Sequence, residues 1–199
     1  MSPRRVAHVA EARRDGAEGG NKHQRDDPDI FLTKIAADGS VHWALEAGGL
    51  RVDEGRAVAA RNGSVYVTGL FNSEAATFGD LPVLDAAGGS DVFVYKVDAL
   101  GTSMWAIAAG GDYNDAGRGI ALDVYGDAYI TGSFNQSATF GIGTSAVMLH
   151  TAGNLDTDSF LMKVWHTGTV DFALQSGGQG IDKVGRDPSR RPCNVCLRV

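Results

Sequence analysis

A loop with the sequence DYNDAG, which begins at Asp112, is the best candidate for a metal site. Asp112, Asn114 and Asp115 offer oxygen ligands at a spacing that partly resembles a calcium loop, and a glycine stands at the sixth position. The fifth position is Ala116, however, and the twelfth is Asp123 where such loops carry Glu. Strands rather than helices are expected on either side. The sequence therefore predicts no cofactor, and calcium at this loop is the one candidate to set against that expectation.

Three aspartates, Asp29, Asp91 and Asp158, recur at the start of similar apolar segments. A carboxylate in this position can bind a cation, or it can cap a turn by accepting backbone N–H groups. We favour capping, because a residue that recurs in every repeat usually serves the repeat itself.

Two further positions recur with the aspartates. Lysines follow them at positions 34, 96 and 163, where they either pair with acids across strands or face solvent. An aromatic residue then occupies a common position as Trp43, Trp105 or Phe172, which we expect in the core between repeat units.

The remaining reactive side chains form no catalytic constellation. The segment GIGTSA, which begins at Gly141, matches a phosphate-loop pattern, but no helix follows it and we interpret it as a turn. Cys193 and Cys196 lack the two further ligands of a zinc site and the helix of a redox pair. The five histidines are scattered, and no nucleophile–base pair can be argued. No catalytic residue is predicted.

The recurring residues belong to one internal repeat. DIFLTKIAADGSVHWALEAGG, DVFVYKVDALGTSMWAIAAGG and DSFLMKVWHTGTVDFALQSGG begin at Asp29, Asp91 and Asp158. The first two copies continue together, as DEGRAVAARNGSVYVTGLFNSEAATFG from Asp53 and DAGRGIALDVYGDAYITGSFNQSATFG from Asp115. Self-similarity at a fixed period indicates units that stack on their neighbours.

Each repeat is predicted to form four antiparallel strands. Segments such as VFVYKV alternate and are rich in β-branched and aromatic residues, and Asn-Gly in RNGS favours a type I′ hairpin turn. Helical periodicity is weak and confined to residues 5–14. Four strands per repeat, with glycine-rich turns and an aromatic anchor, are typical of a β-propeller blade. The predicted fold class is therefore all-β, built from four-stranded antiparallel blades.

Over residues 29–187 the pattern DxFxxK…G…W…GG…D.GR.IA.D..G..Y.TG.F…ATFG resembles the bacterial SBBP-type β-propeller repeat. The resemblance implies a propeller, often in exported or cell-surface proteins and usually without an assigned reaction. Extracellular or cell-surface localisation follows from the resemblance alone, because the N-terminal residues lack the apolar core of a signal peptide.

The repeats divide the chain into three parts. Residues 1–28 are expected to be poorly structured, and residues 188–199 form a tail. Between them, residues 29–187 contain about two and a half repeats, at 29–90, 91–157 and, in part, 158–187. Propellers usually have about 4–8 blades. An incomplete ring would expose blade edges, so we expect the chain to be marginally stable alone, to self-associate or to be a fragment of a longer protein.

Charge and composition narrow the classes of partner. The whole chain carries a net charge of −6, and its acidic middle argues against a nucleic acid as partner. No apolar run approaches the roughly 20 residues of a transmembrane helix. The sequence thus favours a non-catalytic propeller module, a binding or scaffold surface for protein or glycan. The alternative is a fragment of a propeller enzyme or of a quinoprotein-like cofactor-binding protein, which rests on fold analogy.

Overall fold

The computed structural model describes residues 6–13, 27–153 and 156–180, for residues 6–13 at the level of the backbone. These residues form an all-β structure, in which one turn of 3₁₀ helix, η1 (Gly143–Ser145), accompanies the strands and no α-helix occurs within the described ranges. The predicted fold class is confirmed.

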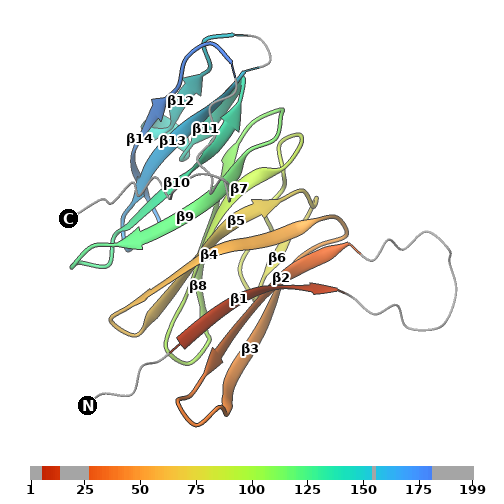
Figure 1. Ribbon diagram of the computed structural model, residues 1–199, viewed down its shortest axis with the longest axis vertical. Coiled ribbons are helices and arrows are strands. Elements are labelled where there is room, and N and C mark those ends of the chain that lie inside the picture. The colour runs from red at the N-terminus through yellow and green to blue at the C-terminus, as the bar shows by residue number, and fades with distance from the viewer. Residues whose placement is uncertain (1–5, 14–26, 154–155, 181–199) are drawn as a thin grey trace, which may run out of the picture.

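The strands form three antiparallel sheets, which we call blades 1 to 3 (Figure 1). Blade 1 has the order β1-β2-β3-β6, blade 2 the order β4-β5-β7-β8-β11-β12, and blade 3 the order β9-β10-β13-β14. In blade 1 the strands are β1 (Val6–Arg13), β2 (Pro28–Ile35), β3 (Val41–Gly48) and β6 (Thr77–Phe78). In blade 2 they are β4 (Asp53–Arg61), β5 (Ser64–Phe71), β7 (Asp91–Val97), β8 (Ser103–Gly110), β11 (Ser137–Phe140) and β12 (Val147–His150). In blade 3 they are β9 (Ala116–Leu122), β10 (Ala128–Asn135), β13 (Thr157–Val164) and β14 (Val170–Ser176).

A blade and a sequence repeat are out of phase. The second copy of the repeat begins at Asp91 and supplies β7 and β8 to blade 2, but β9 and β10 to blade 3. Blades 2 and 3 therefore each combine the second half of one repeat with the first half of the next. Successive blades are joined by this shared repeat as well as by packing.

Local sequence explains the hairpins. Asn62 and Gly63 both have positive φ, 50° and 80°, as the predicted type I′ turn between β4 and β5 requires. The matching turn between β9 and β10 has positive φ at Gly126, and there Asp123 Oδ1 accepts the N–H groups of Tyr125 and Asp127, each at 2.9 Å.

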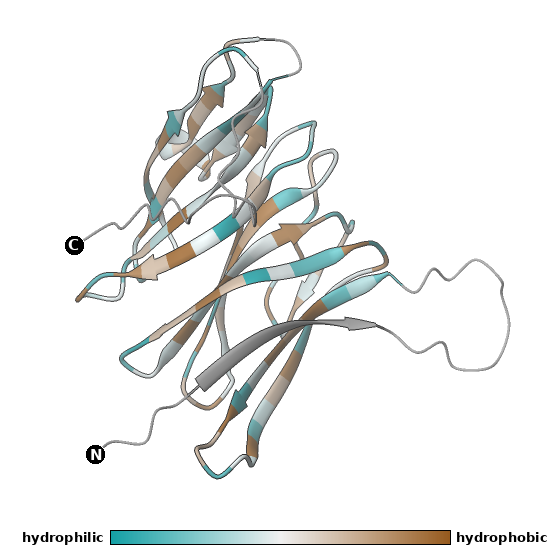
Figure 2. Ribbon diagram, viewed as in Figure 1, coloured by the Kyte–Doolittle hydropathy of each residue, from teal (hydrophilic) through white to brown (hydrophobic). Residues whose placement is uncertain are grey.

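Two apolar cores lie between the blades. Buried and half-buried positions alternate along β13, and Figure 2 shows polar and apolar residues interspersed along the ribbons. One face of β7 packs toward blade 1 through Phe93, Tyr95 and Val97. The other face packs toward blade 3 through Val92 and Val94. Blade 2 is thus covered on both faces.

Two short strands, β6 and β11, which we call clasps, connect blades 2 and 3 to the blade that precedes each of them. The repeated ATFG segment leaves its own blade after β5 or β10, and pairs with the outer strand of the preceding blade. β6 pairs with β3, and β11 pairs with β8 and carries β12 beyond it. Phe78 and Phe140 of these clasps are fully buried in the two inter-blade cores.

Strand β1 differs from the sequence prediction. Weak helical periodicity is the wrong interpretation of residues 6–13, and this part of the segment that we expected to be poorly structured pairs with β2 throughout, from Val6↔Ile35 to Arg13↔Pro28. It takes the place in blade 1 that β5 takes in blade 2, where Val65 lies opposite Val97. Pairing satisfies the backbone groups along the edge of β2, which outweighs a weak local preference.

Candidate functional site

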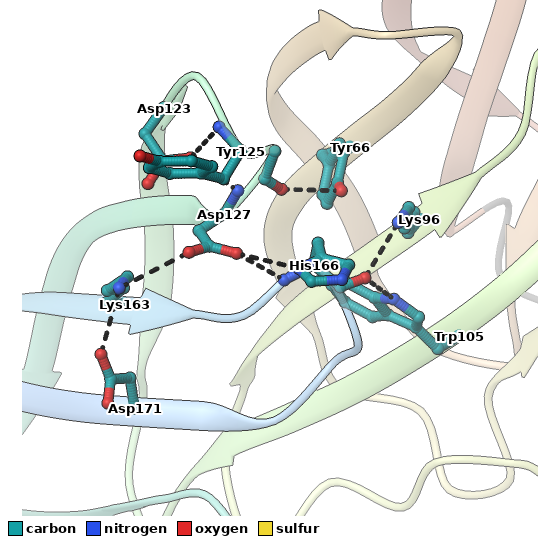
Figure 3. Close-up of polar contacts among 10 residues, drawn as sticks. Tyr66, Lys96, Trp105, Asp123, Tyr125, Asp127, Lys163, His166 and Asp171 are labelled. Atoms are coloured by element: carbon teal, nitrogen blue, oxygen red, sulfur yellow. Dashed lines mark hydrogen bonds and ion pairs between the residues drawn. The ribbon is translucent and has the colours of Figure 1, made fainter.

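We call the interface between two successive blades a joint. The joint between blades 2 and 3 is built around one backbone carbonyl. Lys96 Nζ and Trp105 Nε1 both donate to the carbonyl oxygen of His166, at 2.9 and 3.1 Å (Figure 3). From the same joint, the hydroxyl of Tyr66 donates to the Gly126 carbonyl at 2.8 Å. Two side chains of blade 2 thereby hold the tip of the turn that follows β13. We call this arrangement the latch.

The joint between blades 1 and 2 has the same latch. Lys34 Nζ and Trp43 Nε1 donate to the carbonyl of Ala99, the latter at 3.2 Å. A glycine with positive φ lies against each indole, Gly101 on Trp43 and Gly168 on Trp105, so close that a Cβ would come within 3.0 Å of the ring. The recurring lysine, aromatic residue and turn glycine therefore serve the joints. This agrees with the structural role that the sequence favours for them.

On blade 3 the equivalent lysine faces no further blade among the described residues. Lys163 Nζ lies 3.2 Å from Asp171 Oδ2 and 3.5 Å from Asp127 Oδ2, and its ammonium is 3.4 Å from the centre of the Trp165 ring. Of the three recurring lysines, Lys163 thus pairs with acids, as one sequence interpretation expected.

The Asp127 carboxylate stabilises the turn that the latch holds. It accepts the backbone N–H of His166 at 2.9 Å and contacts the ring Nδ1 at 3.2 Å (Figure 3). Burial of this side chain raises its pKa, but the hydrogen bonds from His166 and the charge of Lys163 outweigh burial and leave the pKa below the ordinary value. The carboxylate is therefore charged, and it fixes the turn whose carbonyl Lys96 and Trp105 bind.

Two buried carboxylates face each other where blade 2 meets β9. Asp91 and Asp115 are 2 % and 0 % exposed, and Asp91 Oδ1 and Asp115 Oδ2 lie 2.3 and 2.8 Å from the point that a Cβ on Gly110 would occupy. Asp115 accepts the N–H groups of Gly111 and Asn135, each at 2.9 Å, and Asp91 Oδ2 accepts that of Ala87 at 2.8 Å. Asp91 Oδ1 accepts no hydrogen bond from the described residues.

The electrostatics of this pair follow from its burial. Desolvation raises the pKa of Asp91 to about 6, against the hydrogen bond from Ala87 and the nearby N–H group of Gly111, which lower it. Desolvation and the charge of Asp91 together raise the pKa of Asp115 to about 7. Capping of a turn by Asp91 agrees with the sequence interpretation, while the close second carboxylate was not anticipated.

A similar pair of carboxylates occurs at the joint between blades 1 and 2. At the first joint, a Cβ on Gly48 would lie 2.8 Å from both Asp29 Oδ1 and Asp53 Oδ2. Asp53 there accepts the Gly49 N–H and the Ser73 hydroxyl, both at 2.7 Å. On blade 3, Asp158 lies beside Gly177 and accepts a hydrogen bond from Gln175 at 3.2 Å.

The residues of the predicted calcium site have separate structural contacts. Asp115 is the buried cap described above, Asn114 Oδ1 accepts the Ser90 N–H at 3.1 Å, and the side chain of Asp112 is exposed. Within the described ranges, no group of three or more His, Cys, Asp or Glu side chains is arranged to hold a metal ion. Calcium binding by this loop stays a prediction.

A polar cleft of about 330 Å³ opens between the edge strands β4 and β9, above the buried aspartates. Arg56 and Arg118 line it from equivalent positions of the two strands. Arg56 contacts Glu54 at 2.9 Å, and Arg118 Nε donates to the Ser133 hydroxyl at 3.2 Å. Around the arginines lie amide and hydroxyl side chains from two loops and from β10 and β13, namely Ser90, Asn114, Ser133, Asn135 and Thr157.

Sequence reasoning missed this cleft, although the signal was present. Both arginines belong to the repeated motif D.GR, which aligns Arg56 with Arg118. The motif indicates that the two arginines occupy equivalent positions in the repeat. It does not indicate that β4 and β9, which belong to different blades, lie close together, because that depends on how the blades stack. Their nearness shows in the electrostatics: partial desolvation lowers the pKa of Arg118, and the charge of Arg56 lowers it further.

The remaining candidates are dispersed. His42, His150 and His166 are exposed and lie on three different blades. The side chains of His8 and His23, and both cysteines, lie outside the described residues. The part of the chain that the structure describes contains no helix long and apolar enough to cross a membrane.

Stacked antiparallel sheets of four or six strands, joined by a repeated latch, make this a β-propeller-like repeat protein. No family model matches the chain. It is 24% identical over 182 residues to an uncharacterized WD repeat-containing protein, L264, of Acanthamoeba polyphaga mimivirus. The match covers 78% of this chain and 13% of the viral protein, so the chain spans a small part of that relative. The similarity supports a propeller-like repeat and does not confirm the SBBP type.

Proposed function

We propose that this chain is a non-catalytic interaction module that binds an acidic segment of a partner protein in the cleft between β4 and β9. The observation that carries the proposal is the presence of Arg56 and Arg118 in one cleft. Guanidinium groups bind carboxylates through paired hydrogen bonds, which gives both affinity and orientation. The repeat similarity to a WD repeat protein supports a role in interaction rather than catalysis.

The local charge favours an anionic ligand. Glu54 forms an ion pair with Arg56, whereas Arg118 donates a hydrogen bond to the neutral Ser133 hydroxyl. Desolvation and the charge of Arg56 lower the pKa of Arg118, while the charge of Glu54 raises it and leaves a net lowering; a carboxylate placed between the two arginines therefore relieves their repulsion. A negative side chain is thus the complement of this cleft.

The lining also distinguishes a protein from a glycan. Sugar rings commonly pack on aromatic faces, and the cleft is lined by Arg, Asn, Asp, Ser, Thr, Leu and Ala. Amide and hydroxyl groups beside the arginines can bind the backbone of an extended peptide. An acidic peptide segment therefore fits better than a neutral glycan.

The proposal is tested with a fluorescein-labelled decaglutamate peptide and a decaglutamine peptide of equal length, by fluorescence anisotropy. We expect the acidic peptide to bind the wild-type chain, with an affinity that falls as salt is raised. Arg118→Gln should weaken binding about tenfold or more, since a hydrogen bond to a charged group contributes roughly 1.5–3 kcal/mol.

Arg51→Gln is the matched control. Arg51 pairs with Glu74 at 3.0 Å, is well exposed and is not part of the cleft, so the same charge is removed elsewhere. Equal losses in Arg51→Gln and Arg118→Gln would show a general charge effect and contradict the proposal. Tighter binding of neutral oligosaccharides than of decaglutamate would favour a glycan.

A further inference from the structure

The outer face of blade 3 repeats a surface that is buried elsewhere in the chain. Register places Leu161 and Leu174 where Val94 and Ile107 stand at the joint between blades 2 and 3. Val94 is fully buried and Ile107 packs against the core, whereas Leu174 is 58 % exposed. We call this surface the tail face; its residues are Tyr129, Leu161, Lys163, Phe172 and Leu174, which correspond to Tyr66, Val94, Lys96, Trp105 and Ile107.

The outer face of blade 1 carries the complementary half. Phe31 and Ile35 stand where the fully buried Phe93 and Val97 stand on β7, and both are only half-buried. Gly39 has a φ of +88°, close to the +90° of Gly101, yet it has no atom within 4 Å of a Cβ position, while Gly101 lies against Trp43. We call Phe31, Ile35 and the turn at 36–39 the head face.

We propose that the tail face of one copy docks on the head face of a second copy, and that two such contacts close a ring. The contact reproduces the internal joints. Lys163 Nζ, which has three donors, binds the carbonyl of the partner copy's head turn as Lys34 and Lys96 bind theirs. The Phe172 ring covers the turn glycine as Trp43 and Trp105 do, without the indole hydrogen bond.

The number of copies follows from the number of blades. The described residues of each chain form three sheets, so two copies make a ring of six, within the usual range of about 4–8. Three copies would give nine, outside that range. Because head and tail are different surfaces, the contact is heterologous, and such contacts give closed rings when the rotation closes. The inference uses neither Arg56 nor Arg118 and is independent of the proposed peptide site.

The test begins with the mass of the full 199-residue chain in sedimentation velocity and light scattering. We expect two copies of 20.9 kDa each. Leu174→Asp on the tail face and Ile35→Asp on the head face should each weaken dimerisation at least tenfold, because each buries a charge in both contacts. Leu50→Asp changes a residue that is 79 % exposed and outside both faces, and it should leave the dimer intact.

A mixing experiment determines which faces meet. In an equimolar mixture of Leu174→Asp and Ile35→Asp, a head-to-tail ring combines both defects in one contact and leaves the other contact intact. Heterodimers should therefore form where neither variant dimerises alone, with circular dichroism confirming that both are folded. Failure to form heterodimers would exclude head-to-tail docking. A wild-type chain that stays monomeric at about 100 µM, far above the Kd of a micromolar complex, would overturn the proposal and indicate that further blades of a longer polypeptide cover these faces.

Discussion

At the scale of single residues, the aspartate pairs are the least expected feature of the joints. Asp91 and Asp115 are buried beside Gly110, where a side chain of any size would collide with both carboxylates. Their raised pKa values, about 6 and about 7, mean that the folded protein binds protons more tightly than the unfolded chain. These two groups therefore contribute stability below pH about 4, and this contribution is lost as the pH rises through 6 and 7.

The pair predicts a stabilising substitution. In Asp91→Asn the amide oxygen can still accept the Ala87 N–H, and the amide NH₂ replaces Oδ1 and can donate toward Asp115. We expect the free energy of unfolding at pH 8 to rise by about 1 kcal/mol, as for one added hydrogen bond. The increase in stability between pH 8 and pH 5, about 1.4 kcal/mol per pH unit for each proton taken up, should become smaller.

Urea unfolding at pH 5 and pH 8 measures both effects. Asp112→Asn is the control, because this neighbouring aspartate is exposed, and its substitution should change neither value. If Asp91→Asn destabilised the protein equally at both pH values, the two carboxylates would not be coupled in the way that their geometry implies.

At the scale of elements, the clasps explain why blades do not separate into independent hairpins. The short strand β11 leaves the β10 end of blade 3 and pairs with β8 of blade 2, at Thr139↔Gly110 and Phe140↔Ala109. Its Phe140 contacts Phe134 and Phe160 of blade 3, with ring centroids 6.3 and 4.8 Å apart. The backbone of Phe140 thus pairs with blade 2, while its side chain packs in the apolar core between blades 2 and 3.

Removing that side chain should loosen the joint. Phe140→Ala is expected to lower the free energy of unfolding by about 3–5 kcal/mol, the usual cost of deleting a buried phenylalanine. Met148→Ala on the adjoining strand β12, at a position 60 % exposed, should change it by less than about 0.5 kcal/mol. Chemical denaturation of both variants measures these free energies of unfolding. A small effect of Phe140→Ala would show that the clasp contributes little to the stability of the joint.

The sequence predicted the elements more completely than their partners. Alternation, the Asn62-Gly63 turn and the repeat itself identify the four long strands of each unit. The clasps β6 and β11 escaped because two to four residues carry too little periodicity, and their partners lie in a different repeat. For the same reason the D.GR motif marked Arg56 and Arg118 without showing that they share a cleft. In the DYNDAG loop, the motif suggested a ligand role for Asn114 and Asp115 but did not indicate the backbone hydrogen bonds that both side chains accept.

At the scale of the whole molecule, the blades are unequal. Blade 2 has neighbours on both faces, and β7 contributes to both apolar cores. Within the described residues, blades 1 and 3 each have one covered face. Stability in repeat architectures is approximately a sum of unit and interface terms, so the middle unit should be the most stable.

Hydrogen exchange should reveal this order. The Leu174→Asp variant is used because it disrupts the proposed dimer contact. In this variant, amides of β5 and β7 should exchange last, and those of β2 and β13 should exchange earlier, through local opening of the end blades. Exchange followed by mass spectrometry measures the order directly. A uniform rate across the three blades would indicate that the stack opens as one cooperative unit.

The phase difference between repeat and blade has a consequence for how such chains grow. Asp29, Asp91 and Asp158 are 62 and 67 residues apart, and each of these intervals carries half of one blade and half of the next. A tandem duplication of one interval, wherever its endpoints fall within the repeat, inserts one complete blade and restores every strand pairing and clasp on both sides. Duplication or deletion of one interval can therefore add or remove a whole blade, and no new type of contact between blades is needed.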